Sequence, residues 1–244
     1  MNILYEDAHC LAVSKPGGLL TQGVAGGEPT LERAVRLHLR PDDPGAVYVG
    51  TVHRLDRVVS GVVLWAKTPK AARRLARQFA ERVVSKEYWA IVSGTPQSAE
   101  GTWDDWLYEH ETGLGVVQIC QGGTPRARRA LTRFRHEVDA EGVPFGCVWL
   151  RLWPETGRTH QLRVQAGARG LPVLGDRAYG SVEPFPIGIA LHARALTVQH
   201  PTLDRPIRFE APLPDTWEER GIRLPGIKDS PRGVEGPGKT HKEN

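Results

Sequence analysis

Hydrophobic and polar positions along the chain form many short apolar runs separated by turn residues, with few stretches of helical spacing. Runs that read as strands lie at residues 2–5, 11–15, 47–50, 62–66, 88–92, 102–107, 115–119, 130–136, 146–153, 189–199 and 206–210. Helical spacing or helix-start signals predict helices at residues 30–39, 68–84, 159–168 and 215–220. Because strands outnumber helices and do not alternate strictly with them, we expect an α+β fold. Its core would be a mixed, largely antiparallel central sheet with flanking helices.

The clearest helix prediction covers residues 68–84. Thr68 suits the N-cap and Pro69 the first helical position. Five apolar residues recur at helical spacing and predict the buried stripe: Ala72, Leu75, Ala76, Phe79 and Val83. Four cations fall on a different face, which we call the basic ridge: Lys70, Arg73, Arg74 and Arg77.

Two other helices are predicted from weaker signals. The helix at residues 30–39 would turn four side chains inward, namely Leu31, Ala34, Val35 and Leu37. The helix at residues 159–168 follows a turn at residues 155–158, and Thr159 is the expected N-cap.

Composition limits the number of domains, the location of the protein and the kinds of site it can hold. The chain has 244 residues, of which 40% are hydrophobic, so one domain with a sizeable core fits residues 1–225. Residues 226–244 are rich in Gly, Pro, Lys and Glu, and we expect a disordered tail. No apolar run is long enough to cross a membrane, and the N-terminus lacks a secretory signal. The three cysteines form no close pair, which argues against a disulfide framework or a zinc site and favours a reducing, cytoplasmic location.

Positive charge is clustered rather than strong overall. The formal net charge is only +4, but seven cations and one acid lie between Lys67 and Lys86. Residues 121–135 hold five arginines and no acid. A polyanionic partner would relieve the repulsion within such clusters. The alternative is a solvated helix face and a basic loop.

The most informative chemistry is the tetrad His53-Arg54-Leu55-Asp56, which lies between two apolar runs. Charges held between buried strands are costly unless they are paired or used. Arg54 and Arg57 flank Asp56 on either side. The tetrad therefore predicts one carboxylate that a rigid scaffold presents for chemistry.

Three segments, taken together, resemble the RluA-type family of RNA pseudouridine synthases. They are residues 53–61, 85–94 and 156–164, and the run Gly175-Asp176-Arg177-Ala178-Tyr179-Gly180 follows them. The resemblance extends from about Ile3 to Trp217. It implies the pseudouridine synthase fold with a central RNA-binding cleft, and conversion of a uridine in structured ribosomal or transfer RNA to pseudouridine with no cofactor and no metal. We also expect base flipping and a monomer with no obligatory protein partner.

The resemblance implies roles for three catalytic residues. Asp56 would be the catalytic aspartate, which either attacks the sugar or removes a sugar proton. Arg163 would pair with Asp56 and favour its charged form. Tyr88 would stack on the uracil and help to move the proton from carbon 5, with a strand tyrosine in the core as the alternative.

Further residues would bind the substrate by the same resemblance. Arg54 would hold the target nucleotide outside the helix, with an ion pair to Asp56 or a phosphate contact as alternatives. Leu162 would pack against the base or belong to the core. His53 and His160 would line the cleft as structural residues, and Arg158 completes the set. The predicted RNA surface comprises Lys70, Arg73, Arg74, Arg77, Arg126, Arg128 and Arg129.

Two departures from the family leave other functions open. Val59 stands where the family usually has threonine, so a local turn or cleft contact could be weaker. The extra RNA-binding domain of many relatives is not expected before the first strand. Alternative readings are an RNA-binding protein without turnover and a hydrolase of the nucleoside bond.

Overall fold

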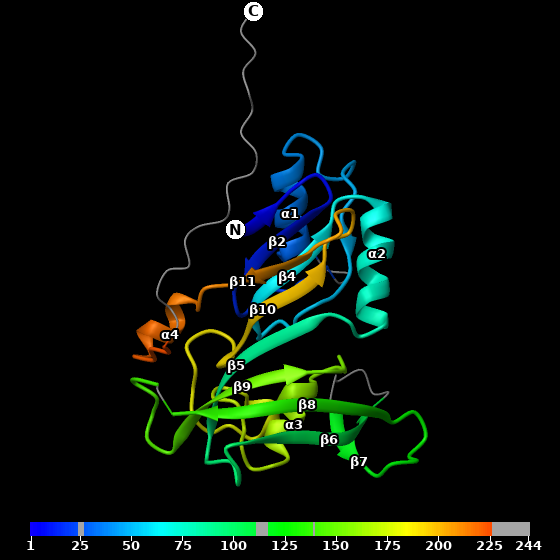
Figure 1. Ribbon diagram of the computed structural model, residues 1–244. Coiled ribbons are helices and arrows are strands. Elements are labelled where there is room, and N and C mark those ends of the chain that lie inside the picture. Colours follow the sequence, from blue (N-terminus) through cyan, green and yellow to red (C-terminus); the bar gives the residue numbers. More distant parts are fainter. Residues whose placement is uncertain (24–26, 111–116, 139, 226–244) are drawn as a thin grey trace, which may run out of the picture.

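The computed structural model describes residues 1–23, 27–110, 117–138 and 140–225 (Figure 1). Within these ranges, eleven strands form a single sheet. The strands are β1 (Asn2–Glu6), β2 (Cys10–Lys15), β3 (Gly50–Thr51), β4 (Ser60–Ala66), β5 (Ser85–Ser93), β6 (Glu100–Glu109), β7 (Val117–Cys120), β8 (Arg128–Glu137), β9 (Cys147–Pro154), β10 (Leu191–Gln199) and β11 (Pro206–Glu210). The helices are α1 (Leu31–Leu39), α2 (Pro69–Ala80), α3 (Gln161–Gly167), α4 (Asp215–Glu219) and the 3-10 turn η1 (Arg177–Tyr179).

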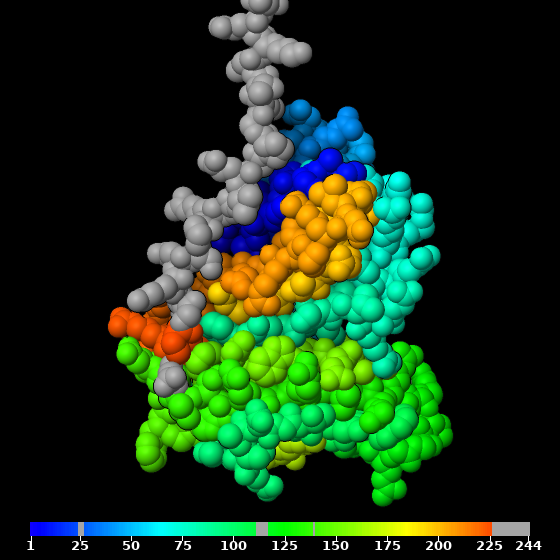
Figure 2. All heavy atoms as spheres, in the orientation of Figure 1, coloured from blue at the N-terminus to red at the C-terminus, as the bar shows by residue number. Residues whose placement is uncertain are grey.

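The order of strands across the sheet is β1-β2-β4-β10-β5-β9-β8-β6-β7, with β3 paired to β4 and β11 to β10. Only β4 and β10 pair in parallel among the strands described; the other pairs are antiparallel. The expected α+β fold with a mixed, largely antiparallel sheet is confirmed. Figures 1 and 2 show two parts, β1, β2, β4, β10 and β11 above and β6 to β9 below, with β5 at their junction.

The upper part of the sheet is covered on both faces. Strand β4 is buried at every position, and alternate side chains enter different cores. Val63 and Trp65 join the cluster that contains Leu31 and Val35 of α1. Val62, Leu64 and Ala66 join the cluster that contains Ala71 and Leu75 of α2. Strands covered on both sides lack polar alternation, which explains the apolar run in the sequence.

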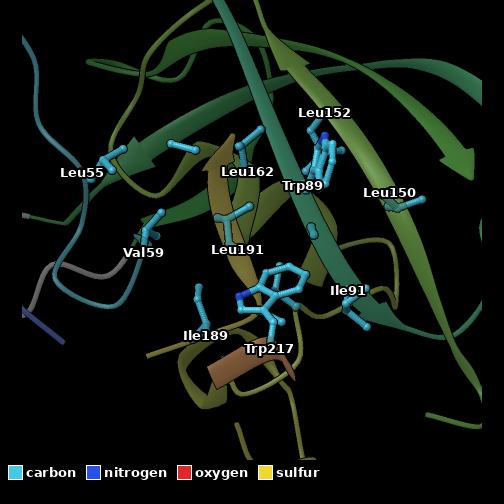
Figure 3. Packing of buried hydrophobic residues seen from close by; sticks show 14 of the residues in the cluster. Leu55, Val59, Trp89, Ile91, Leu150, Leu152, Leu162, Ile189, Leu191 and Trp217 are labelled. Carbon is cyan, nitrogen blue, oxygen red and sulfur yellow. The ribbon is translucent and has the colours of Figure 1, made fainter. Parts of the chain in front are cut away.

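The lower part is covered by α3. Val164 packs with Leu107, Val117 and Ala130 of β6, β7 and β8. In the main core, Leu162 of α3 lies with Leu55 and Val59 from the loop before β4 and with Leu191 of β10 (Figure 3). Trp217 of α4 is fully buried in the same core. The start of α3 is therefore held against the loop that carries the acidic tetrad.

Gly61 is required where β4 meets β10. Its φ of 121° lies in the region that glycine favours. A Cβ at this position would fall 2.3 Å from the carbonyl oxygen of Ala193, its partner in the parallel register. Any other residue would push apart the strands that support the tetrad.

The helix predicted at residues 68–84 begins as expected but ends early. Thr68 caps α2 by accepting a hydrogen bond from the Ala71 amide, and the helix ends at Ala80. Arg82 then adopts a left-handed conformation with φ 59°. The stripe does not continue to Val83, which is 63% exposed. The buried residues of α2 are Ala71 and Leu75, while Ala76 is exposed.

Three other predictions are wrong in detail. The strand expected at residues 47–50 is reduced to β3, because residues 44–47 form a turn and bends and residues 48–49 have no regular structure, which leaves Tyr48 exposed. Leu37 of α1 is also exposed. Thr159 does not cap α3, since its hydroxyl donates to Glu109 Oε2. His160 takes the cap position with φ 50° and forms no capping bond. Residues 115–116 of one predicted strand and the tail at 226–244 lie outside the described residues.

None of the described helices combines the length and the apolar character that spanning a membrane would need.

Candidate active site

Asp56 lies in the loop between β3 and β4. The Val59 amide donates to the Asp56 carbonyl oxygen at 3.1 Å and closes a turn around the carboxylate. The valine side chain is buried in the core. The turn thus closes through the backbone, and the hydroxyl that a threonine would bring is not needed for it. On the other side, the Thr21 hydroxyl donates to the Leu55 carbonyl oxygen at 2.7 Å.

Lys15 holds the same loop from its buried side. Its side chain is fully buried, and its ammonium donates to the carbonyl oxygens of Pro16, Leu19 and Arg57 at 3.0, 2.7 and 3.1 Å. Burial lowers the pKa of Lys15 to about 7, although the charge of Asp56 acts in the opposite direction. All three N–H groups of the ammonium are used. Lys15 therefore fixes the backbone on which Asp56 is mounted.

The Asp56 carboxylate is held by Arg163, as the resemblance implied. Arg163 Nη1 lies 3.1 Å from Asp56 Oδ2. The guanidinium also forms a two-bond pair with Asp176, with Nε–Oδ2 at 2.7 Å and Nη2–Oδ1 at 2.9 Å. Burial would lower the pKa of Arg163, but the hydrogen bonds and charges of Asp176 and Asp56 outweigh it and raise that pKa.

The two carboxylates beside Arg163 differ in exposure. The Asp176 side chain is 2% exposed and that of Arg163 8%, whereas 31% of the Asp56 side chain remains exposed. Asp176 thus orients Arg163 from the buried side, while the Asp56 carboxylate stays partly exposed. Asp176 belongs to one of the motifs that carry the family resemblance, but the sequence indicated no role for it. The available signal in the sequence was an acid in a short run between two glycines, Gly175 and Gly180. Both glycines adopt a positive φ in the structure.

His160 and Tyr179 border this pair. His160 Nδ1 lies 2.8 Å from the Tyr179 hydroxyl, and its Nε2 lies 3.7 Å from Asp56 Oδ2. Burial lowers the pKa of His160 despite the nearby charge of Asp56. Burial thus favours the neutral form of the ring, which lies beside Asp56. Tyr179 also lies under the Arg163 guanidinium, 5.0 Å from ring centroid to Cζ.

A cavity of about 810 Å³ brings the predicted residues together. Asp56, Tyr88, Leu162 and Arg163 all line it. Its walls come from the loop before β4, from β5 and from the start of α3, so it lies where the two parts of the sheet meet. A nucleotide-sized group with a few polar anchors is the kind of ligand such a cavity accepts.

Tyr88 presents a protonated phenol to this cavity. Burial, and then the charge of Asp56, raise its pKa above the usual value for tyrosine. The residue lies on β5 opposite Leu152 of β9. A neutral phenol can donate a hydrogen bond to a base and offer its ring for stacking.

The remaining predicted substrate residues also line the cavity. Arg54 is exposed, and its side chain forms no hydrogen bond or ion pair with another described residue. His53 accepts a hydrogen bond from the Leu64 amide at 2.9 Å and stacks on Phe79, which makes it structural. Arg158 donates through Nε to the Arg129 carbonyl oxygen. Leu162 is 6% exposed and belongs to both the core and the cavity wall.

The predicted RNA surface divides into two parts. All four cations of the basic ridge are exposed on α2, and Arg74 Nη1 donates to the Pro201 carbonyl oxygen. None of the four lines the cavity. On β8, Arg129 forms a two-bond ion pair with Asp104 of β6. Arg126 and Arg128 line a smaller cavity of about 320 Å³ that adjoins the first through Gly157, Arg158 and Thr159.

One group among the described residues could in principle hold a metal: Asp7, Cys10 and His200. None of them lines the main cavity. Asp7 already accepts hydrogen bonds from the His9 and Cys10 amides and from His200. Burial raises the pKa of Cys10 to about 12, so the sulfur stays a thiol. These residues form a structural hydrogen-bond cluster.

Comparison with known proteins gives a family-model match at residues 9–168, described as RNA pseudouridylate synthase. The dual-specificity RNA pseudouridine synthase RluA of Escherichia coli O157:H7 is 38% identical over 213 residues, covering 86% of this chain and 92% of that protein. The ribosomal large subunit pseudouridine synthase D of Vibrio cholerae serotype O1 is 35% identical over 242 residues, covering 92% and 71%. Among solved structures, human RNA Pseudouridylate Synthase Domain Containing 1 aligns with a TM-score of 0.73 and 27% identity, covering 90% of this chain and 86% of that one.

Proposed function

The chain belongs to the RNA pseudouridylate synthase family and is an RNA pseudouridine synthase, an isomerase, and we propose that Asp56 is the group that reacts with its uridine substrate. The observation that carries this proposal is the environment of the carboxylate. Among the described residues, the Asp56 carboxylate accepts a hydrogen bond from Arg163 alone, and Asp56 lines a cavity that Tyr88 also lines. An ionised carboxylate at the floor of a nucleotide-sized cavity is what attack on a ribose, or removal of a ribose proton, requires.

The reaction changes connectivity and leaves composition unchanged. The bond between uracil N1 and the ribose C1′ breaks, and a bond between uracil C5 and C1′ forms. The proton on C5 leaves, and N1 gains one. With Asp56 as nucleophile, the carboxylate oxygen holds C1′ while the uracil turns. With Asp56 as base, it removes a ribose proton and returns it after the uracil has turned.

Tyr88 is proposed to hold the uracil and to take part in the proton transfer from C5. Because its phenol is protonated at neutral pH, it accepts the C5 proton only if its own proton passes on at the same time. Stacking of the ring on uracil needs no such change. Arg54 is proposed to take the place of the extruded base, since its guanidinium is exposed at the cavity and free to stack.

The substrate is proposed to be ribosomal or transfer RNA. One relative carries the large ribosomal subunit in its name, and another is named as having dual specificity. All three cysteines are free thiols, which fits the reducing cytoplasm. A monomer suffices for the proposal, because the residues it uses come from one chain.

The test uses RNA labelled with tritium at uracil C5. We expect tritium release by the wild type and a loss of at least about 10⁴-fold in Asp56→Asn, which removes the nucleophile or base while keeping the shape. RNA binding by Asp56→Asn, measured by filter retention, should stay within about twofold of wild type. A variant that releases tritium at the wild-type rate would refute the role of Asp56. Free uracil as the product would refute isomerisation in favour of hydrolysis.

A further inference from the structure

Three cations lie together on the cavity wall beyond the residues placed around Asp56. They are Arg82, just after α2, Lys86 at the start of β5, and Arg158 between β9 and α3. Arg82 and Lys86 also line a second cavity of about 400 Å³. The two cavities share this wall, so the cluster is reached from both sides. We call these three residues the cation cluster.

The partly buried Lys86 differs from the fully buried Lys15, which supports the Asp56 loop, in how its ammonium is satisfied. Lys15 donates to three carbonyl oxygens. Lys86 donates to one, that of Thr156 at 2.8 Å. An ammonium has three N–H donors. Two donors of Lys86 therefore have no acceptor within the described part of the chain, and Gly157 beside it has no side chain to fill the space.

No carboxylate neutralises the cluster in the part of the chain that the structure describes. None of its three residues takes part in an ion pair there. Glu155 lines both cavities, but its carboxylate lies 3.2 Å from Arg133 Nε. Burial lowers the pKa of Lys86 to about 8, and the charges of Arg82 and Arg158 add to this effect. Burial also lowers the pKa of Arg158, followed by the charges of Arg82 and Arg128.

Folding thus gathers like charges on a partly buried wall and leaves hydrogen-bond donors without a protein acceptor. Such an arrangement costs free energy unless an anion binds to it. Arg82 adds to that cost, because its backbone lies in the left-handed region. A set of donors that the protein itself does not satisfy is the form a preorganised anion site takes.

We propose that Arg82, Lys86 and Arg158 bind one phosphate of the RNA backbone next to the nucleotide whose ribose faces Asp56. This inference rests on the proposed function and adds a site for the substrate backbone. A phosphodiester offers two charged oxygens, which match a lysine ammonium and the planar donors of an arginine. A flipped nucleotide is joined to the strand through its flanking phosphates. Fixing one of them holds the ribose over Asp56.

The test compares Lys86→Met with Arg40→Met in the tritium-release assay. Arg40 is an exposed cation that follows α1 and lines none of the cavities described, so its loss changes the net charge alone. We expect Lys86→Met to lower kcat/KM by about 10- to 100-fold, mainly through KM, as loss of a charge-assisted contact predicts. The slope of log KM against log salt should fall by about 0.7 to 0.9, the value for one phosphate. Arg40→Met should alter neither quantity.

Ethylation interference identifies the phosphate. On the RNA that the wild type modifies, we expect ethylation of one phosphate beside the target uridine to block the reaction. For Lys86→Met, the same ethylation should have no further effect. If Lys86→Met fails to fold, as judged by thermal unfolding, Arg158→Met provides the same comparison, and Lys86→Arg should restore the salt slope.

An unchanged salt slope, or equal sensitivity of wild type and Lys86→Met to ethylation at every phosphate, would overturn the phosphate site. These results differ from failure of the proposed function, in which the wild type itself releases no tritium.

Discussion

The charged groups of the cavity and those on strand β8 differ in how many partners the protein itself gives them. On β8, Arg129, Arg133 and Arg135 each form an ion pair, with Asp104, Glu155 and Glu137. In the cavity, Asp56 has a single guanidinium contact and Lys86 a single carbonyl contact. The arginines at residues 121–135 suggested a polyanionic partner in the sequence. In the fold, much of their charge is neutralised by the protein itself, whereas the cavity keeps open positions for a ligand.

Two aspartates show this difference with the same bonding geometry. Asp176 and Asp104 each accept two hydrogen bonds from one arginine, through Nε and Nη2. The Asp176 side chain is 2% exposed and that of Asp104 43%. Water competes for the exposed pair, so it contributes little to stability, while the buried pair holds Arg163 against Asp56.

The largest effect on stability is therefore expected from Asp176→Asn. The substitution leaves Arg163 buried with one charged partner, and we expect a loss of about 3–5 kcal/mol in the free energy of unfolding. Among molecules that remain folded, kcat should fall by about 10²-fold with little change in KM, because Asp176 orients Arg163 without touching the substrate. Urea unfolding and single-turnover tritium release measure the two quantities.

Asp104→Asn is the matched control for that variant. It removes the same kind of carboxylate from the same kind of pair, and both measurements should stay at wild-type values. If the two substitutions had equal effects, burial would not explain why the Asp176–Arg163 pair matters more than the Asp104–Arg129 pair.

A smaller effect is expected on acidification, from a histidine whose burial disfavours its charged form. His192 is fully buried, with Nδ1 2.9 Å from the Ser60 hydroxyl and Nε2 3.2 Å from the Ala211 carbonyl oxygen. Burial lowers its pKa to about 4. The unfolded chain binds the proton first, so stability should fall as the pH drops from about 6.5 to 4, by up to about 3 kcal/mol from this residue.

Urea unfolding at a series of pH values measures this decline. His192→Gln retains a donor and an acceptor but does not titrate. In this variant, the free energy of unfolding should decline less on acidification, because the contribution of His192 is missing. An identical decline in both proteins would mean that His192 is not protonated on unfolding in this range.

The smallest effect separates two neighbouring arginines of β8. Arg128 is exposed and lines the small cavity beside Arg158, while Arg129 is paired with Asp104. We expect Arg128→Gln to weaken RNA binding about two- to fivefold and to flatten its salt dependence. Arg129→Gln should change binding by less than about twofold. Filter binding at several salt concentrations measures both variants. A larger loss of binding in Arg129→Gln than in Arg128→Gln would show that Arg129, rather than Arg128, contacts the RNA.

Local signals in the sequence predicted much of this molecule. The apolar run of β4 and the Thr68-Pro69 start of α2 were predicted correctly, because capping and burial act over a few residues. The end of α2 was not, since Val83 is apolar and continues the spacing, while the left-handed Arg82 turns the chain away. The pairing of Asp56 with Arg163 followed from family resemblance, and the structure confirms the contact.

The sequence by itself determined the chemistry available to this protein: a carboxylate flanked by arginines, a tyrosine on a strand and an excess of cations. Only the tertiary structure decided which charges are neutralised. Asp104 lies 25 residues from Arg129, and Asp176 lies 13 residues from Arg163. No local pattern indicates such partners, because the energy of a charge depends on distance and burial in space. The same physics leaves Asp56 and Lys86 incompletely satisfied at one cavity, where a substrate can complete their contacts.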